Sequence, residues 1–194
     1  MAHHPVPVQR QVRGRKSRAG SGRGGPGAGP RLSFREATRA DAGIIAELRA
    51  SAARDLTSRF GHGPWSSEPT ERGVLYELRI SRLWVVRRGK AQIATFRLGT
   101  RKPWAIDRSY FTDASRPVYL TDMAVRPDHQ RRGVGRRCLA EMARIARAWP
   151  GDSIRLDAYD AEAGAGGFYD RCGFRHVANV MYRGVPHTYH ELML

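Results

Sequence analysis

The sequence predicts a domain of the α/β (α+β) class, with strands and helices in the order β α α β β β α β α β β. Short runs that alternate apolar and polar residues, as half-buried strands do, are interleaved with longer runs whose apolar residues recur every three or four positions, as in amphipathic helices. The chain of 194 residues is long enough for one sizeable core but short for two. We therefore expect one folded domain, residues 31–194, preceded by an N-terminal tail, residues 1–30.

The first half of the domain is predicted to hold a strand, two helices and three further strands. Thr38 with Asp41 resembles a capping pair at a helix start, and the Gly, Pro and Ser residues of 60–69 separate the two helices. A short turn around Gly89 is typical of a hairpin, and Pro127 ends the last strand because proline offers no N–H to a sheet. The predicted elements are a strand at 32–38, helices at 43–54 and 70–80, and strands at 83–87, 91–98 and 118–125.

The second half is predicted to hold an amphipathic helix, a strand, a short helix and a terminal strand pair. Apolar residues from Gly133 to Trp149 recur at steps of three and four, and Pro150 with Gly151 ends that helix. Glycine and proline at 184–186 place the turn of the terminal pair. The predicted elements are a helix at 133–149, a strand at 153–158, a helix at 163–172 and strands at 174–183 and 187–194.

The N-terminal tail is basic and rich in glycine. It holds six Arg and Lys residues and no acidic residue, and its stretch 14–30 has too few apolar side chains to offset the entropy of ordering the backbone. We therefore expect the tail to be disordered. A nucleic-acid-binding arm and a solvated extension without a role are both open, and the composition favours the second, so a nucleic-acid partner is not expected.

Charge and cysteine content bound the class of protein. The net charge of +16 attracts anions of several kinds, so it does not by itself distinguish nucleic acid, an acidic membrane and a polyphosphate cofactor. Two cysteines, Cys138 and Cys172, are too few for a disulfide scaffold, and no apolar run approaches the length of a membrane span. We expect a soluble, cytoplasmic protein without a membrane partner.

The segment between the strand ending at Val125 and the helix beginning at Gly133 predicts an anion site. The first amides of a helix have no partners inside it and carry a partial positive charge, and glycine lets an anion approach the backbone closely. Arg131, Arg132 and Arg136 add cations to the same end. The alternative is a basic, solvent-exposed helix start.

Two better-known phosphate loops do not fit this segment. A dinucleotide fingerprint would need glycine at the position of Cys138 and its first glycine nearer to the strand. A Walker loop would need Gly-Lys-Ser or Gly-Lys-Thr, and the sequence contains neither.

The pattern V-x-P-x-x-Q-R-x-G-x-G from Val125 to Gly135 resembles the acyl-CoA signature of the GNAT acyltransferase superfamily. Downstream, the aromatic-Tyr-x-x-x-Gly-Phe stretch from Phe168 to Phe174 resembles the other hallmark of that family. The likeness covers roughly residues 31–194. It implies the GNAT fold, a mixed and mostly antiparallel sheet flanked by helices, with a V-shaped gap between strands 118–125 and 153–158. It also implies acetyl-CoA as the co-substrate.

The resemblance further implies roles for single residues. Met123 and Val125 would offer backbone groups to the pantetheine arm, and the amides of the signature loop would bind the pyrophosphate. The expected acyl-CoA-binding residues are Met123, Val125, Gln130, Arg131, Arg132, Gly133, Val134, Gly135 and Arg136. Tyr169 would lie near the thioester sulfur, where a phenol with a pKa of about 10 can protonate the leaving thiolate. The alternative for Tyr169 is a core aromatic.

The attacking amine must lose a proton, and a carboxylate is the usual base. Asp122, on the strand beside Met123, is the candidate; an ion pair with one of the many arginines is its alternative. The sequence departs from the family at Glu162, where many relatives carry asparagine, and the glycines before Phe168 suggest a late helix start. His176, His187 and His190 lack the spacing of metal ligands, so we interpret them as structural and expect no metal.

Taken together, these patterns predict an N-acetyltransferase that moves an acetyl group from acetyl-CoA to an amine by direct attack in a ternary complex. A small-molecule or peptide amine is the expected acceptor, and a homodimer is conceivable. The rival hypothesis is a non-catalytic CoA-binding or regulatory module that uses its basic tail to bind nucleic acid or protein.

Overall fold

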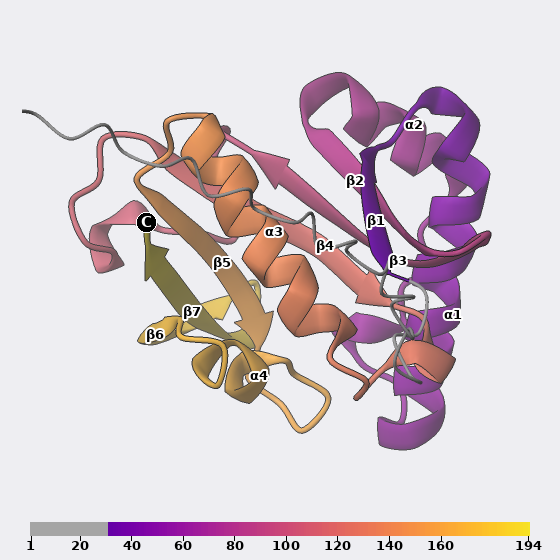
Figure 1. Cartoon of the computed structure of the whole chain (residues 1–194). Helices are drawn as coiled ribbons and strands as arrows, with labels where there is room; N and C mark the ends of the chain where they lie inside the picture. Colours follow the sequence, from indigo (N-terminus) through magenta and orange to yellow (C-terminus); the bar gives the residue numbers. More distant parts are fainter. Residues whose placement is uncertain (1–30) are drawn as a thin grey trace, which may run out of the picture.

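A seven-stranded sheet in the order β1-β2-β3-β4-β5-β7-β6 forms the centre of the computed structural model, which describes residues 31–194 (Figure 1). The tail predicted at 1–30 lies outside the described residues. Every strand pair is antiparallel except β4 with β5. The strands are β1 Leu32–Glu36, β2 Arg82–Arg88, β3 Ala91–Gly99, β4 Pro117–Val125, β5 Ser153–Tyr159, β6 Arg175–Tyr182 and β7 Val185–Met193. The helices are α1 Ala42–Phe60, α2 Glu71–Ile80, α3 Val134–Ala148 and α4 Gly166–Asp170. The predicted fold class and element order are confirmed.

Helices cover both faces of the sheet, and alternation along the strands assigns each side chain to a face. On β2, Leu83 and Val85 pack with α1 and α2, whereas Trp84 and Val86 belong to the core beneath α3. On β5, Leu156 and Ala158 lie in the α3 core with Tyr169 of α4. The odd-numbered residues of β5 therefore face the side that α1 and α2 cover.

Among residues 31–194 one pair of strands is parallel, β4 with β5, and it separates before either strand ends. β4 and β5 are in register only from Pro117 to Tyr119, opposite Ser153 to Arg155. Beyond those residues the two strands diverge, and α3 crosses in front of them (Figure 1). The predicted gap between the strands is therefore present.

Several element boundaries differ from the sequence-based expectation; the first strand, for example, ends at Glu36 and not at residue 38. α1 continues past residue 54 and ends at Phe60. Arg59 pairs with Asp55 one turn earlier at 3.3 Å, and the capping residue Gly61 adopts a φ of 77°. The Thr38 amide does donate to Oδ2 of Asp41, at 2.7 Å, but the two residues close a 3-10 turn that precedes α1. α4 begins at Gly166, not at residue 163, and both Gly166 and Gly167 lie inside it.

The terminal hairpin turns earlier than expected. Arg183 and Gly184 alone form the turn, with φ values of 51° and 78°. Two residues of positive φ give the turn whose twist matches a β-hairpin. Pro186 therefore lies inside β7, opposite Met181, and not in the turn. Within residues 31–194 no helix is long and apolar enough to span a bilayer.

Candidate functional site

A β-bulge in β4 opens the gap. Thr121 pairs with Arg97 and Ala124 with Thr95, so Asp122 and Met123 together oppose the single residue Phe96 of β3. Asp122 takes a φ of 49°, in the left-handed region that few non-glycine residues occupy. A bulge of this kind bends its strand and redirects side chains. It lies just beyond the last paired residues of β4 and β5.

A cavity of about 360 Å³ lies in the gap. Residues of β4, β5, the connection between β5 and α4, and α4 line it, together with Leu56 of α1. Those with polar groups are Thr121, Asp122, Asp157, Tyr159 and Tyr169. The cavity thus brings together the two residues that the sequence suggested for catalysis, Asp122 and Tyr169, and the cofactor-contact candidate Met123.

The signature loop presents a row of unpaired amides at the start of α3. The first amide of the helix with a backbone partner is that of Arg137, which donates to Gly133 O at 3.2 Å. Within residues 31–194, none of the six amides from Arg131 to Arg136 has an acceptor. Gly133 has a φ of 75° and open space where a Cβ would stand. This end of α3 can therefore surround an anion with N–H groups.

Gln130 holds the loop against the strand. Its side-chain Nε2 donates to the carbonyl oxygen of Val125 at 3.0 Å. The amide of Arg126 donates to Ile93 O of β3 at 2.9 Å, so by alternation the backbone groups of Val125 face the open side of β4. Because Gln130 occupies the Val125 carbonyl, the amide is the group that Val125 can offer to a ligand.

The arginines of the loop are exposed. Within the described part of the chain, Arg131 and Arg132 form no ion pair. Arg136 extends towards α4, where its guanidinium donates to Arg171 O at 3.5 Å. Val134 is buried in the core beside Cys138, so its backbone amide is the part available to a ligand.

Tyr169 packs in the core and also lines the cavity, so its position is compatible with both interpretations that the sequence left open. Its ring packs against Phe168 at 5.3 Å and Phe174 at 5.6 Å between centroids, and it also lines the cavity. Burial raises the pKa of its phenol well above the usual value, and the charge of Asp157 raises it further. The hydroxyl therefore stays protonated at neutral pH.

Asp122 is held by an arginine. Nε and Nη2 of Arg97 both lie 2.7 Å from its Oδ2, and the Asp122 side chain is 36% exposed. This ion pair was the alternative to the base role in the sequence analysis. It commits one oxygen of Asp122 to a cation that does not titrate.

Asp157 and His187 were missed as site residues. Asp157 lines the cavity from β5, and its Oδ2 accepts from His187 Nδ1 at 2.8 Å. The sequence did carry a signal: Leu156 and Ala158 alternate as core residues, so Asp157 must face the opposite side of the sheet. What it could not show is that β7 places His187 beside that face.

The connection between α1 and α2 reaches this end of the site. The ring of Trp65 meets Tyr159 of β5 edge-on, with centroids 6.1 Å apart. The Tyr159 hydroxyl donates to Pro64 O at 3.3 Å, and the Trp65 indole donates to Gly61 O at 3.0 Å. Trp65 therefore anchors the connection to the end of β5 beside the cavity.

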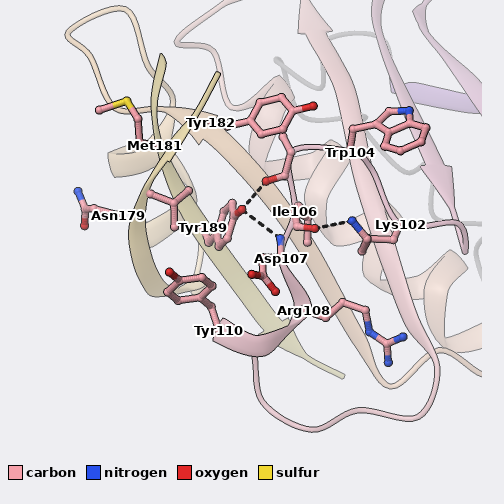
Figure 2. A pocket seen from close by; sticks show the side chains of 12 residues that line it. Lys102, Trp104, Ile106, Asp107, Arg108, Tyr110, Asn179, Met181, Tyr182 and Tyr189 are labelled. Atoms are coloured by element: carbon pink, nitrogen blue, oxygen red, sulfur yellow. Dashed lines mark hydrogen bonds between the residues drawn. The ribbon is translucent and has the colours of Figure 1, made fainter. Parts of the chain in front are cut away.

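A second, larger cavity of about 650 Å³ lies between the β3–β4 connection and β6. Figure 2 shows Tyr189 between the two walls, with its hydroxyl bonded to Ala105 O and to the amide of Asp107. Trp104, which is 84% exposed, and Tyr182 line it as well. None of the predicted catalytic or cofactor residues borders this cavity.

Thiol and metal chemistry find little support among residues 31–194. Burial raises the pKa of Cys138 to about 12, which keeps the thiol protonated. His190 is buried, and burial lowers its pKa, so its ring is neutral near pH 7. No group of three or more His, Cys, Asp or Glu side chains in this part of the chain could hold a metal ion.

Comparison with known proteins places these features in a family. The profile of the acetyltransferase (GNAT) family matches residues 50–174. No curated protein sequence matches the chain significantly. Solved structures of low identity share the fold. One is yncA of Salmonella typhimurium, a candidate acetyltransferase solved with its cofactor acetyl-CoA. The two are 20% identical, with 84% of this chain and 94% of that one covered and a TM-score of 0.60. A GNAT-family acetyltransferase of Listeria monocytogenes is 15% identical, with 86% and 97% covered and a TM-score of 0.68.

Proposed function

The chain belongs to the acetyltransferase (GNAT) family, and from that premise we propose that it transfers an acetyl group from acetyl-CoA to an amine by direct attack while both substrates are bound. One observation carries the proposal. The unpaired amides from Arg131 to Arg136 adjoin, through β4, the cavity that Tyr169 lines. An anion-binding helix start and a buried proton donor thus stand at the two ends of one gap.

The residues of the signature loop fit acetyl-CoA. Six unpaired amides and the open backbone at Gly133 suit a pyrophosphate, and the exposed guanidinium groups of Arg131 and Arg132 would add charge attraction. Gln130 would act indirectly, because its side chain fixes the turn that carries these amides. The backbone beside Met123 and the Val125 amide would bind the pantetheine arm in the gap.

Acetyl-CoA supplies a thioester, an acyl group that amines attack readily. The side chains of this protein would then position the reactants and handle protons. The Val125 amide, on the open side of β4, would polarise the acyl carbonyl. The Tyr169 phenol would give its proton to the departing thiolate sulfur, and a carboxylate of the cavity would take a proton from the amine.

The acceptor is a small-molecule or peptide amine. It would reach the cavity from the face of the sheet that α1 and α2 cover, since α3 and the cofactor loop occupy the other face. The anchored connection around Trp65 forms one wall of that approach. A carboxylate there, Asp122 or Asp157, can attract the cationic amine.

Calorimetric titration with acetyl-CoA tests the cofactor site. NAD and ATP serve as competing nucleotides, and Gly133→Glu is compared with Gly133→Ala. Both substitutions strain a backbone of positive φ, but only glutamate puts a negative charge at the anion site. We expect selective binding by the wild type, a modest loss in Gly133→Ala and a further loss of at least roughly tenfold in Gly133→Glu, equivalent to about 1.4 kcal/mol.

Equal binding of acetyl-CoA by the two variants would remove the amides of this loop as the pyrophosphate site. Absence of acetyl-CoA binding by the wild type would overturn the proposed function. Release of CoA thiol in the presence of primary amines then tests transfer itself.

A further inference from the structure

Two carboxylates line the cavity, and their surroundings differ. Two nitrogens of Arg97 lie 2.7 Å from Oδ2 of Asp122. Within residues 31–194 Asp157 forms no ion pair with an arginine; its partner is His187, with Oδ2 and Nδ1 2.8 Å apart. An imidazole is the one side chain that gains and loses a proton readily near neutral pH. The Asp157 carboxylate therefore has an imidazole as its polar partner, whereas one oxygen of Asp122 is occupied by a guanidinium.

The pair is enclosed on one side and open on the other. The side chains of His187 and Asp157 are 8% and 20% exposed. The His187 ring packs edge-on against Tyr159 at 5.2 Å and Tyr182 at 6.2 Å, which leaves it little freedom to rotate. Within residues 31–194, Asp157 is the sole hydrogen-bond partner of that ring. The carboxylate reaches the cavity, and the imidazole orients it from behind.

Asp157 also lies near the proton donor. It lines the same cavity as Tyr169, and its charge acts on the phenols of both Tyr169 and Tyr159, whereas the charge of Asp122 acts on Tyr159 and not on Tyr169. An amine that attacks a thioester beside Tyr169 would therefore meet Asp157 on the acceptor face. A donor and an acceptor of protons on either side of one reacting centre is the arrangement that this transfer needs.

We propose, resting on the proposed function, that the Asp157 carboxylate accepts the proton of the incoming amine and that His187 is its positioning residue. The ammonium gives one proton to Asp157, and the freed nitrogen lone pair forms a bond to the acyl carbon. The carbon–sulfur bond breaks, and the second proton of the nitrogen leaves to solvent. The sulfur takes the Tyr169 proton; Tyr169 regains one from solvent, and Asp157 releases the one it took.

The test is the pH dependence of kcat/KM. Release of the CoA thiol is the readout, and the acceptor is ethanolamine, spermidine, a lysine-containing peptide or water alone. Asp157→Asn removes the base without changing its size. His187→Asn keeps an N–H near the position of Nδ1, whereas His187→Ala removes it. Asp122→Asn tests the rival base, and Asp160→Asn, an exposed aspartate at the end of β5 that bonds Asn179 at 2.7 Å, is the matched control.

We expect Asp157→Asn to lower kcat/KM for amines roughly a hundred- to ten-thousandfold and to move the acid limb of the profile towards the pKa of the free amine. His187→Ala should shift the same limb, and His187→Asn should restore most of the rate. The titratable groups that face the pair are Asp122 on β4, Tyr159 on β5, Tyr182 on β6, Tyr189 on β7 and Tyr169 on α4. Tyrosines ionise on the alkaline side, so the acid limb distinguishes Asp157 from all of them except Asp122.

The outcomes separate this inference from the proposed function. If Asp157→Asn turns over as fast as the wild type, Asp157 is not the base. The same conclusion follows if the acid limb of the pH profile moves in Asp122→Asn and not in Asp157→Asn. A limb that is the same in His187→Ala as in the wild type overturns the role of His187. If the wild type releases CoA thiol no faster than a reaction without protein, for every amine and for water, the proposed function is overturned, and this inference with it.

Discussion

Gly135 at the start of α3 and the ring of Phe168 on α4 approach so closely that a Cβ at position 135 would lie 2.9 Å from the Phe168 Cζ. Each of the two sequence hallmarks contributes one member of this contact. The contact thus joins the loop that would hold the cofactor to the helix that carries Tyr169, and glycine at 135 is what allows α3 and α4 to meet there.

Gly135→Ala should destabilise the protein, because the methyl group collides with the Phe168 ring, at a cost of roughly 1–3 kcal/mol that exceeds the gain of about 1 kcal/mol in helix propensity. In a Phe168→Ala background the collision is gone, so the same substitution should become neutral or stabilising. Thermal unfolding of the four proteins measures this coupling, with roughly 2–4 °C in Tm per kcal/mol for a chain of this size. Additive effects of the two substitutions would show that the ring moves aside freely.

Much of the fold and of the candidate cofactor loop was predictable because the signals for them are local. The periodicity of apolar residues predicted every strand and helix in order, and the spacing from Val125 to Gly135 predicted the loop. The glycines before Phe168 suggested a late start of α4, which does begin after residue 163, although Gly166 and Gly167 themselves lie inside the helix. Errors remained at the ends of elements, as with Pro186, where the turn depends on two backbone angles that the residue types only bias.

The partners of the two cavity carboxylates were less predictable because they depend on contacts between distant segments. Arg97 and Asp122 are 25 residues apart, and Asp157 and His187 are 30 apart. Which arginine meets Asp122 depends on the bulge at Asp122 and Met123, and no local pattern signals it. The sequence around His187 lacks the spacing of metal ligands and therefore indicated a structural role. The pairing of β7 with β5 places His187 beside Asp157.

Arg131→Ala and Arg132→Ala should each weaken acetyl-CoA binding roughly two- to fivefold at low salt, since exposed charges contribute modestly to an anion site. The loss should shrink as ionic strength rises and screens the charge, whereas binding through the backbone amides persists. Calorimetry at two salt concentrations measures this, with Arg147→Ala at the opposite end of α3 as the control. A loss that is independent of salt would point to a packing role for these side chains.

Glu191→Gln should destabilise the fold by about 3–5 kcal/mol, because it leaves the buried guanidinium of Arg155 without its charge partner. Glu191 Oε1 lies 2.9 Å from Arg155, and the two side chains are 0% and 2% exposed. Chemical denaturation measures the difference. Glu141→Gln, which removes a surface pair with Arg144, is the control and should change stability little.

The same pair predicts a pH dependence. Burial alone would raise the pKa of Glu191, but hydrogen bonds from Thr112, Arg155 and Arg175 outweigh it and the pKa is lowered. A lowered folded-state pKa stabilises the protein fully above the unfolded value of about 4.3, and that stabilisation is lost as pH falls through the folded value. The stability gap between the wild type and Glu191→Gln should therefore be constant above about pH 5 and shrink below about pH 4. A gap that widens in acid would contradict this.

Tyr169→Phe removes only the hydroxyl from a ring that packs against Phe168 and Phe174, so the fold and acetyl-CoA binding should be preserved. If the phenol protonates the leaving thiolate, kcat should fall roughly a hundred- to ten-thousandfold. Tyr76→Phe, an exposed tyrosine on α2 that is remote from the cavity, controls for the loss of a hydroxyl as such.

The pH profile of kcat separates the two roles of Tyr169. A proton donor must be protonated, and burial together with the Asp157 charge raises the pKa of Tyr169, so the donor is lost only above the usual tyrosine value of about 10. The wild type should keep its tyrosine-dependent rate throughout the neutral and mildly alkaline range. An alkaline loss below about pH 9 that Tyr169→Phe abolishes would mean that the phenol titrates in a more polar site than the one described. Full kcat in Tyr169→Phe would reduce the residue to packing, and the departing sulfur would then have to take its proton from solvent.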